Sequence, residues 1–316
     1  MIPAMAFTAS VWLMLIMFSS PASAQLLGHN LLGDFGLTSG TQPAPGTYSS
    51  ALYYGYKGDT IRDEDGNVLG LNRGDLDVNG YALGLWHVTD RKIFGGNYSF
   101  SIWPSATDNA LEAPVLGLAQ STDLGFGDLY VQPVNLGWHT GRADYIAGIG
   151  FYAPTGRYED GAPDNVGLGM WSFELFAGTT IYLDSEHTWN FAATAFYETH
   201  SEKEGSDVKV GDILTLEGGL GKSFKGGLVN AGLAYYAQWK VTADDFGSEG
   251  LPPGVSPGRH RGYGVGPEIT IPIASKSTLY GFFNVRYFWE SGVRSSVEGK
   301  SLVLTLTLPI PSVPLQ

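Results

Sequence analysis

Residues 228–241 read LVNAGLAYYAQWKV, and this stretch decides the fold class. Every second residue from Val229 to Val241 is small, aliphatic or aromatic. The polar groups fall at the positions between them, which are Asn230, Gln238 and Lys240, beside Tyr236. Successive side chains of a β-strand point to opposite faces, so the stretch predicts a strand with one apolar and one polar face. Such a strand suits a pore barrel, which has lipid outside and a polar interior.

The same alternation recurs along the chain. Residues 278–289 place Val285, Tyr287 and Trp289 on one face and Asn284 and Arg286 on the other. Residues 167–183 and 188–199 repeat the pattern, and each carries a glutamate on its polar face. Trp and Tyr gather near the predicted strand ends, as they do where aromatic rings lie at a membrane interface.

Twelve stretches of this kind are predicted, joined by connections that alternate between long and short. The predicted strands are 46–57, 74–88, 93–103, 126–137, 143–153, 167–183, 188–199, 209–223, 228–241, 261–273, 278–289 and 300–308. The longer connections include 57–73, 104–125, 154–166 and 242–260, and the short ones include 89–92, 138–142, 184–187, 224–227 and 274–276. Outer-membrane barrels have an even strand number, short periplasmic turns and longer outer loops. The sequence therefore predicts an all-β chain forming a transmembrane antiparallel up-and-down β-barrel of about 12 strands.

Composition agrees with this fold class. Charged residues make up 16% of the chain, against roughly 25% in typical soluble domains, whereas aromatic residues reach 13%. The net charge of −13 argues against nucleic acid as a partner, because phosphate binding needs clustered Lys and Arg. The chain has no cysteine, which excludes disulfides and thiolate metal sites.

The sequence divides into four parts. Residues 1–24 are expected to be a cleaved signal peptide, with an apolar run at Met5–Phe18 and small residues at Ala22-Ser23-Ala24. Residues 25–45 form an apolar N-terminal segment that is expected either to enter the lumen as a plug or to lie along the periplasmic rim. Residues 46–308 make the barrel, and 309–316 are a C-terminal tail.

The polar faces of the strands supply the candidate pore-lining residues. Charged side chains facing lipid would cost about 2–4 kcal/mol each, so their inward orientation is expected. The predicted set is Asp128, Tyr130, Gln132, Glu174, Glu198, Glu217, Asn230, Tyr236, Gln238, Lys240, Glu268, Asn284 and Arg286. Two interpretations stay open: opposite charges pair across a packed interior, or the set lines a hydrated, net acidic constriction.

Three prolines interrupt predicted strands. Pro133, Pro267 and Pro272 cannot donate to a strand ladder. They indicate either bulges and strand ends or a local break in the wall that opens the lumen sideways into lipid.

Enzymatic motifs are absent. The chain has no G-x-S-x-G nucleophile motif, and its six histidines form no H-E-x-x-H pair. We therefore expect no catalytic residue, no metal and no cofactor, with an outer-membrane lipid hydrolase as a minor alternative.

Four motifs, in order, carry a resemblance to a known family: GTQPAPGTY at 40–48, GFGDLYVQP at 125–133, APTGRY at 153–158 and GVGPE at 264–268. The chain resembles the SphA-like outer-membrane proteins of the meta-pathway of phenol degradation. The resemblance implies an outer-membrane barrel linked to the catabolism of aromatic compounds. We therefore expect a monomeric channel for passive uptake of small hydrophobic or aromatic solutes, whose other partners are outer-membrane lipid and the barrel-insertion machinery. A closed structural or partner-binding barrel is the alternative.

Overall fold

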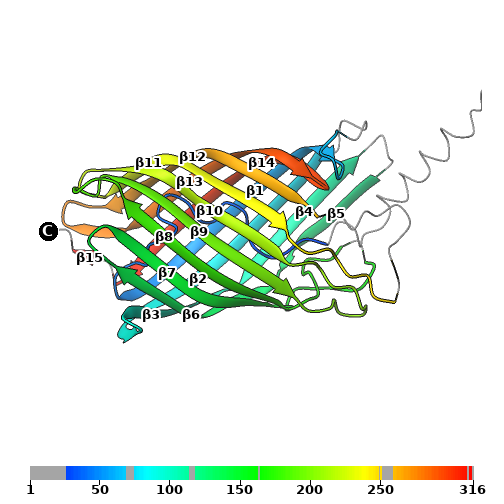
Figure 1. Cartoon of the computed structure of the whole chain (residues 1–316), viewed down its shortest axis with the longest axis horizontal. Coiled ribbons are helices and arrows are strands. Elements are labelled where there is room, and N and C mark those ends of the chain that lie inside the picture. Colours follow the sequence, from blue (N-terminus) through cyan, green and yellow to red (C-terminus); the bar gives the residue numbers. More distant parts are fainter. Residues whose placement is uncertain are drawn as a thin grey trace, which may run out of the picture.

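The computed structural model describes residues 26–68, 75–113, 118–162, 164–248, 250, 259–311 and 313–314, so the predicted signal peptide lies outside the described residues. The described chain is built of β-strands (Figure 1). These are β1 Gly46–Arg62, β2 Asp75–Ile93, β3 Gly96–Trp103, β4 Ser105–Ala113, β5 Leu118–Phe126, β6 Leu129–His139, β7 Ala143–Ala153, β8 Ser172–Tyr182, β9 Trp189–His200, β10 Ile213–Phe224, β11 Val229–Lys240, β12 Arg261–Ala274, β13 Thr278–Arg294, β14 Ser296–Ile310 and β15 Val313–Pro314. No helix in the described ranges is long and apolar enough to cross a bilayer.

The strands close into one antiparallel barrel. Strand β1 pairs with β14 on one side, where Ala51 faces Leu306, and with β2 on the other, where Ala51 faces Leu83. Strands β3 and β4 form one wall strand interrupted at Pro104, and both pair with β2. Strands β5 and β6 are likewise joined through Gly127 and Asp128. The wall thus has twelve strands, which confirms the predicted fold.

The short turns gather at one end of the barrel, the predicted periplasmic end. The first of them is Phe94-Gly95, where both residues have positive φ, of 51° and 83°. The predicted turn at 89–92 is therefore wrong, because those residues continue β2 and the two-residue turn comes after Ile93. Tight turns of this kind favour positive φ because their twist matches that of the flanking strands.

At the outer end the wall is taller than predicted. Residues 104–125 are not a plain loop but carry β4 and β5, because β4 supplies ladder partners for β2 from Asp75 to Ala82. The stretch 290–299 is likewise not a loop: β13 runs to Arg294, and β14 begins after the single residue Ser295. Conversely, residues 167–171 precede β8 rather than starting it. Unpaired backbone groups of one long strand need partners, so neighbouring strands extend together.

The C-terminal tail is shorter than expected. Strand β14 reaches Ile310, and β15 pairs with Thr278 and Leu279 of β13. Residues 312, 315 and 316 of the predicted tail lie outside the described residues.

Strands such as β8 and β11 have an apolar outer face and a covered inner face. In β8, Phe173 and Leu175 are 52% and 60% exposed, whereas Ser172 and Glu174, which alternate with them, are 0% and 3% exposed. In β11, Leu233 is exposed and Tyr236 is buried. Exposed apolar side chains around a closed barrel with no free edge are what a bilayer requires.

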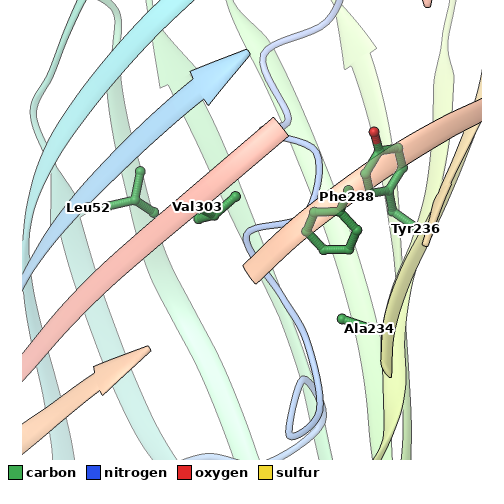
Figure 2. Close-up of a cluster of buried hydrophobic side chains, with 5 residues drawn as sticks. All are labelled: Leu52, Ala234, Tyr236, Phe288 and Val303. Carbon is green, nitrogen blue, oxygen red and sulfur yellow. The ribbon is translucent and has the colours of Figure 1, made fainter. Parts of the chain in front are cut away.

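The interior holds apolar clusters as well as polar groups. Leu52, Ala234, Tyr236, Phe288 and Val303 meet inside the barrel from β1, β11, β13 and β14 (Figure 2). Leu31 and Leu32 of the N-terminal segment pack against this cluster. The segment before β1 therefore shares the lumen with the inward side chains of the wall.

Candidate solute-binding lumen

The N-terminal segment, residues 26–45, is held inside the barrel by carboxylates of the wall. Glu198 on β9 accepts hydrogen bonds from the backbone N–H groups of His29 (2.6 Å) and Asn30 (3.2 Å). Glu217 on β10 accepts from those of Gly33 (2.8 Å) and Phe35 (2.7 Å). A third carboxylate of the wall, on β12, also takes part; β11 lies between β12 and β10.

That third carboxylate, Glu268, accepts from the N–H of Leu37 at 2.9 Å. It also forms an ion pair of 3.4 Å with Arg286, whose guanidinium donates to the carbonyl of Gly33 at 3.3 Å. A segment made of turns leaves many backbone N–H groups without ladder partners, and a buried carboxylate needs donors. The backbone N–H groups of the segment and the buried carboxylates of the wall therefore supply each other's hydrogen-bond partners.

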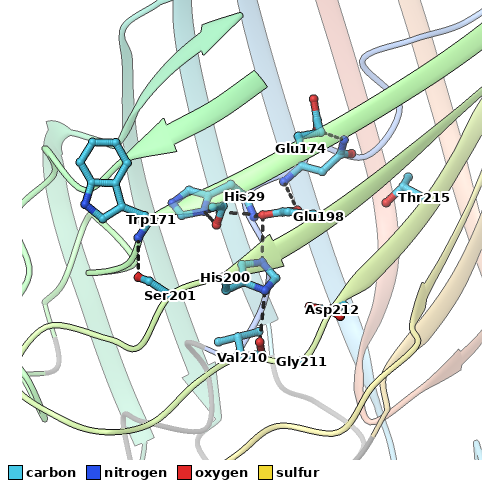
Figure 3. A network of polar contacts seen from close by, with 12 residues as sticks. His29, Trp171, Glu174, Glu198, His200, Ser201, Val210, Gly211, Asp212 and Thr215 are labelled. Atoms are coloured by element: carbon cyan, nitrogen blue, oxygen red, sulfur yellow. Dashed lines mark hydrogen bonds and ion pairs between the residues drawn. The ribbon is translucent and has the colours of Figure 1, made fainter. Parts of the chain in front are cut away.

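At the outer end, His29 joins the segment to three wall elements. Its Nε2 lies 2.8 Å from Asp128, its Nδ1 lies 2.7 Å from Ser172 Oγ, and its ring stacks on Tyr152 with centroids 4.6 Å apart. Burial lowers the pKa of His29, but hydrogen bonds and charges of Asp128 and Glu198 outweigh it and raise the pKa above its usual value. Figure 3 shows His29 beside Glu198, which also accepts from His200 at 3.0 Å.

Other polar contacts fix the two ends of the segment. Lys240 donates to the carbonyl of Leu26 at 2.8 Å and to Asp244 at 2.7 Å. Further along, Asn190 donates to the carbonyl of Leu37.

Towards the short turns, Thr41 donates to Asp144 at 3.0 Å and Gln42 donates to Ser99 at 2.9 Å. The segment therefore runs along the lumen from the outer end to the inner end, where it continues into β1.

Two glycines of the segment lie too close to the wall for any larger residue. A Cβ added to Gly36 would lie 1.8 Å from Glu268 Oε2, and one added to Gly40 would lie 2.1 Å from the carbonyl carbon of Thr179. Close approach of two backbones is a characteristic use of glycine.

Beside the segment, the lumen contains a cavity of about 920 Å³. It lies between the segment and the inward side chains of β1, β2, β4, β6 and β14, and its wall is mainly carbon. Several aromatic rings face it: Phe35, Tyr54, Trp86, Trp103, Tyr130 and Tyr152. An apolar cavity with a few polar groups is the usual form of a site for a small organic molecule.

The predicted pore-lining residues divide between this cavity and the contacts of the segment. Those on the cavity wall are Asp128, Tyr130, Gln132, Glu174, Gln238 and Arg286. The remaining seven are buried inside the barrel away from the cavity wall: Glu198, Glu217, Asn230, Tyr236, Lys240, Glu268 and Asn284. Three of the glutamates hold the N-terminal segment, a role that the sequence did not indicate.

Sequence reasoning missed the site residues contributed by the segment, chiefly His29, Asp34 and Phe35. It also missed Glu290, which accepts hydrogen bonds from Tyr56 and Tyr236 at 2.8 Å each. The one available signal was the apolar, glycine-containing character of residues 26–40, which pointed to the segment but to no residue in it.

The three prolines differ in their surroundings. Pro133 lies in a β-bulge, because the register shifts between Val131 and Val134 against β7. Pro267 and Pro272 lie in register, opposite Leu233 and Phe282 respectively.

Outside the wall near Pro133 is an apolar hollow of about 480 Å³ that includes Val134, Gly148 and Leu175. Phe176 contributes to both this hollow and the inner cavity. Phe176 is therefore the residue of β8 that borders both spaces. In the described ranges no group of His, Asp and Glu side chains is arranged to hold a metal ion.

The comparisons with known proteins agree with this architecture. The COG4313 outer membrane channel from Pseudomonas putida F1 superposes with a TM-score of 0.72 at 14% identity, covering 89% of this chain and 99% of that one. The β domain of the Bordetella autotransporter BrkA gives a TM-score of 0.48 at 16% identity, covering 84% and 99%. The first of these superpositions shows the barrel fold alone, and no curated protein matches. The model of the family described as putative MetA-pathway of phenol degradation matches residues 58–306, and the chain belongs to this family.

Proposed function

We propose that the protein is an outer-membrane channel for passive uptake of small hydrophobic or aromatic compounds. The observation that carries the proposal is the aromatic-lined cavity of about 920 Å³ inside a barrel whose outer face is apolar. Membership of a family named for phenol degradation supports the aromatic class of solute. No chemical step is needed, and neither cofactor nor catalytic residue takes part.

A solute enters between the outer loops, rests against the aromatic rings of the cavity and leaves down its gradient. Conduction requires binding that is favourable enough for entry and weak enough for release. The N-terminal segment is the plug of this channel, because it fills the part of the lumen that the cavity leaves. The channel works as a monomer, since one barrel contains the whole cavity.

Two exit routes are open to the solute. The first leads past the segment to the periplasmic end, and the second leads sideways through the wall at the Pro133 bulge, where Phe176 separates the cavity from the outer hollow. Widening the second route with Phe176→Ala is expected to speed uptake of apolar solutes without speeding uptake of sugars. Equal acceleration of both would assign the route to the periplasmic end.

Liposome uptake tests the function itself. The refolded chain from Gln25 is compared with a chain starting at Gly46, using neutral solutes of graded size and a small phenol. Faster uptake by the shorter chain is expected, because it lacks the plug. If neither form admits any solute while heat-dependent gel mobility shows both folded, the closed structural barrel replaces the channel. Hydrolysis of the liposome lipids by the purified protein would instead indicate the lipid hydrolase.

A further inference from the structure

Asp34 differs from the other carboxylates that face the inner cavity. Glu174 accepts hydrogen bonds from Tyr130 at 2.7 Å and from Asn30 at 3.1 Å. Glu290 accepts from two tyrosines and from the N–H of Gly299. Asp128 accepts from two backbone N–H groups and contacts His29. Among the described residues, no donor makes a hydrogen bond of 3.5 Å or less to the Asp34 carboxylate, and no cation lies within 4.0 Å of it.

The cation that influences Asp34 is already engaged elsewhere. Arg286 pairs with Glu268 and donates to the carbonyl of Gly33. Burial raises the pKa of Asp34 despite the opposing charge of Arg286, and the half-buried residue lies on the cavity wall. A carboxylate that is partly removed from water is costly unless a donor reaches it. Because Asp34 faces the cavity, that donor comes from what the cavity holds.

The surroundings of Asp34 define the rest of the solute. Phe35 is its neighbour in the chain, and Tyr130 and Tyr152 face the same cavity with their ring centroids 4.4 Å apart. Such rings pack well against another flat ring, in offset or edge-to-face contact. The carboxylate and the rings together suit a molecule with an aromatic body and one polar head.

We propose that Asp34 is the head-group site of the cavity and binds aromatic solutes that carry a hydrogen-bond donor, either a hydroxyl or an amino group. The inference rests on the proposed function and refines it, because it separates donor-bearing aromatics from plain hydrocarbons and ethers. The donor gives its hydrogen to a carboxylate oxygen while the ring lies against the tyrosines. Solutes whose polar group is a carboxylate are disfavoured, because they bring an acceptor and no donor to Asp34.

The test compares phenol with anisole, which keeps the ring and the oxygen but has no donor. Isothermal titration calorimetry with the refolded chain from Gln25 in detergent is expected to show phenol bound about tenfold or more tightly than anisole, as for a hydrogen bond to a charged group. Aniline is expected to follow phenol. Cyclohexanol, which has the donor but no aromatic ring, is expected to bind more weakly than phenol.

Three variants assign the preference to Asp34. Asp34→Leu is expected to bring the ratio of the phenol and anisole affinities near one while anisole still binds. Asp34→Asn is expected to keep part of the preference for phenol, because its amide oxygen still accepts a hydrogen bond. Asp90→Leu, which changes an exposed carboxylate near the short turns, keeps the wild-type ratio. Heat-dependent gel mobility checks that each variant is folded.

A phenol preference that persists in Asp34→Leu, or that is absent from the wild type, overturns the head-group site. If the wild type still binds and transports anisole in that case, the proposed channel function stands. If no aromatic solute binds or crosses, the channel function fails together with the site.

Discussion

At the scale of single residues, Gly36 determines how closely the N-terminal segment approaches the wall. We expect Gly36→Ala to displace the segment, because the added Cβ would lie 1.8 Å from an oxygen of Glu268, whose carboxylate is fixed by Leu37, Asn284 and Arg286. Overpacking of this kind costs about 1–3 kcal/mol. Bilayer conductance is expected to rise several-fold.

Gly141→Ala is the matched control, because a Cβ at Gly141 meets nothing within 4 Å. Unchanged conductance of the Gly36 variant would show that the segment tolerates a methyl group and does not depend on close packing.

A second residue-scale prediction concerns pH. The pKa of His29 is raised in the folded protein, so its contribution to holding the segment is fully present below the usual imidazole pKa of about 6.5. That contribution is lost as the pH rises through the higher folded value. The groups that face His29 are Asp128, Ser172, Tyr152, Glu198 and, through Glu198, His200.

Conductance of the wild type is therefore expected to rise as the pH is raised above about 6.5, because the raised pKa of His29 moves the loss of its charge to higher pH. His29→Gln keeps a polar side chain but cannot become charged, so its conductance is expected to vary little over that range. An equal rise in both proteins would assign the pH dependence to another group.

The inward residues of the wall could be predicted from the sequence, and those of the segment could not. Glu174 and Glu198 follow from a period of two along regular strands. His29 and Asp34 lie in a segment without periodicity, and the partners of His29 lie far away in the sequence: Glu198 is 169 positions from it. No local pattern encodes such a contact.

At the scale of elements, β10 holds the middle of the segment through one side chain. Glu217→Gln replaces a carboxylate that accepts from Gly33 and Phe35 with an amide that has a single acceptor atom. We expect the loss of one of these hydrogen bonds to weaken the docking of the segment by roughly 1–3 kcal/mol. Hydrogen exchange is expected to become faster in residues 29–37 and to stay unchanged in the wall strands.

Glu186→Gln, in an exposed turn, provides the control for that substitution. Equal exchange in the two variants would contradict the assigned role of Glu217.

The prediction of elements failed where strands leave the membrane. Strands β4 and β5 are polar enough to resemble a loop, and their pairing depends on the length of β2 rather than on their own residues. The apolar alternation marks only the part of a strand that faces lipid. Strand ends in water carry no such mark, which is why the wall is taller than the sequence indicated.

At the scale of the whole molecule, the N-terminal segment passes through the barrel from end to end. Leu26 packs with Met170 and Val210 of the outer connections, whereas Gly46 begins β1 at the end of the short turns. Strand β1 is also the strand that closes the wall, by pairing with β14. The strand that seals the ring is therefore the direct continuation of the chain that runs through it.

We therefore expect closure of the barrel and entry of the segment to be one event of assembly, in which Leu26 is delivered to the outer side. We expect a small, fast-folding domain fused ahead of Leu26 to prevent formation of the heat-resistant, fast-migrating barrel on gels. The same domain fused after Gln316 is expected to leave it intact. A barrel that closes normally with the leading domain still on the periplasmic side would show that the segment can enter after the wall has sealed. If closure and entry are one event, the order in which this chain is assembled follows from its topology, because the strand that closes the wall continues directly from the segment inside it.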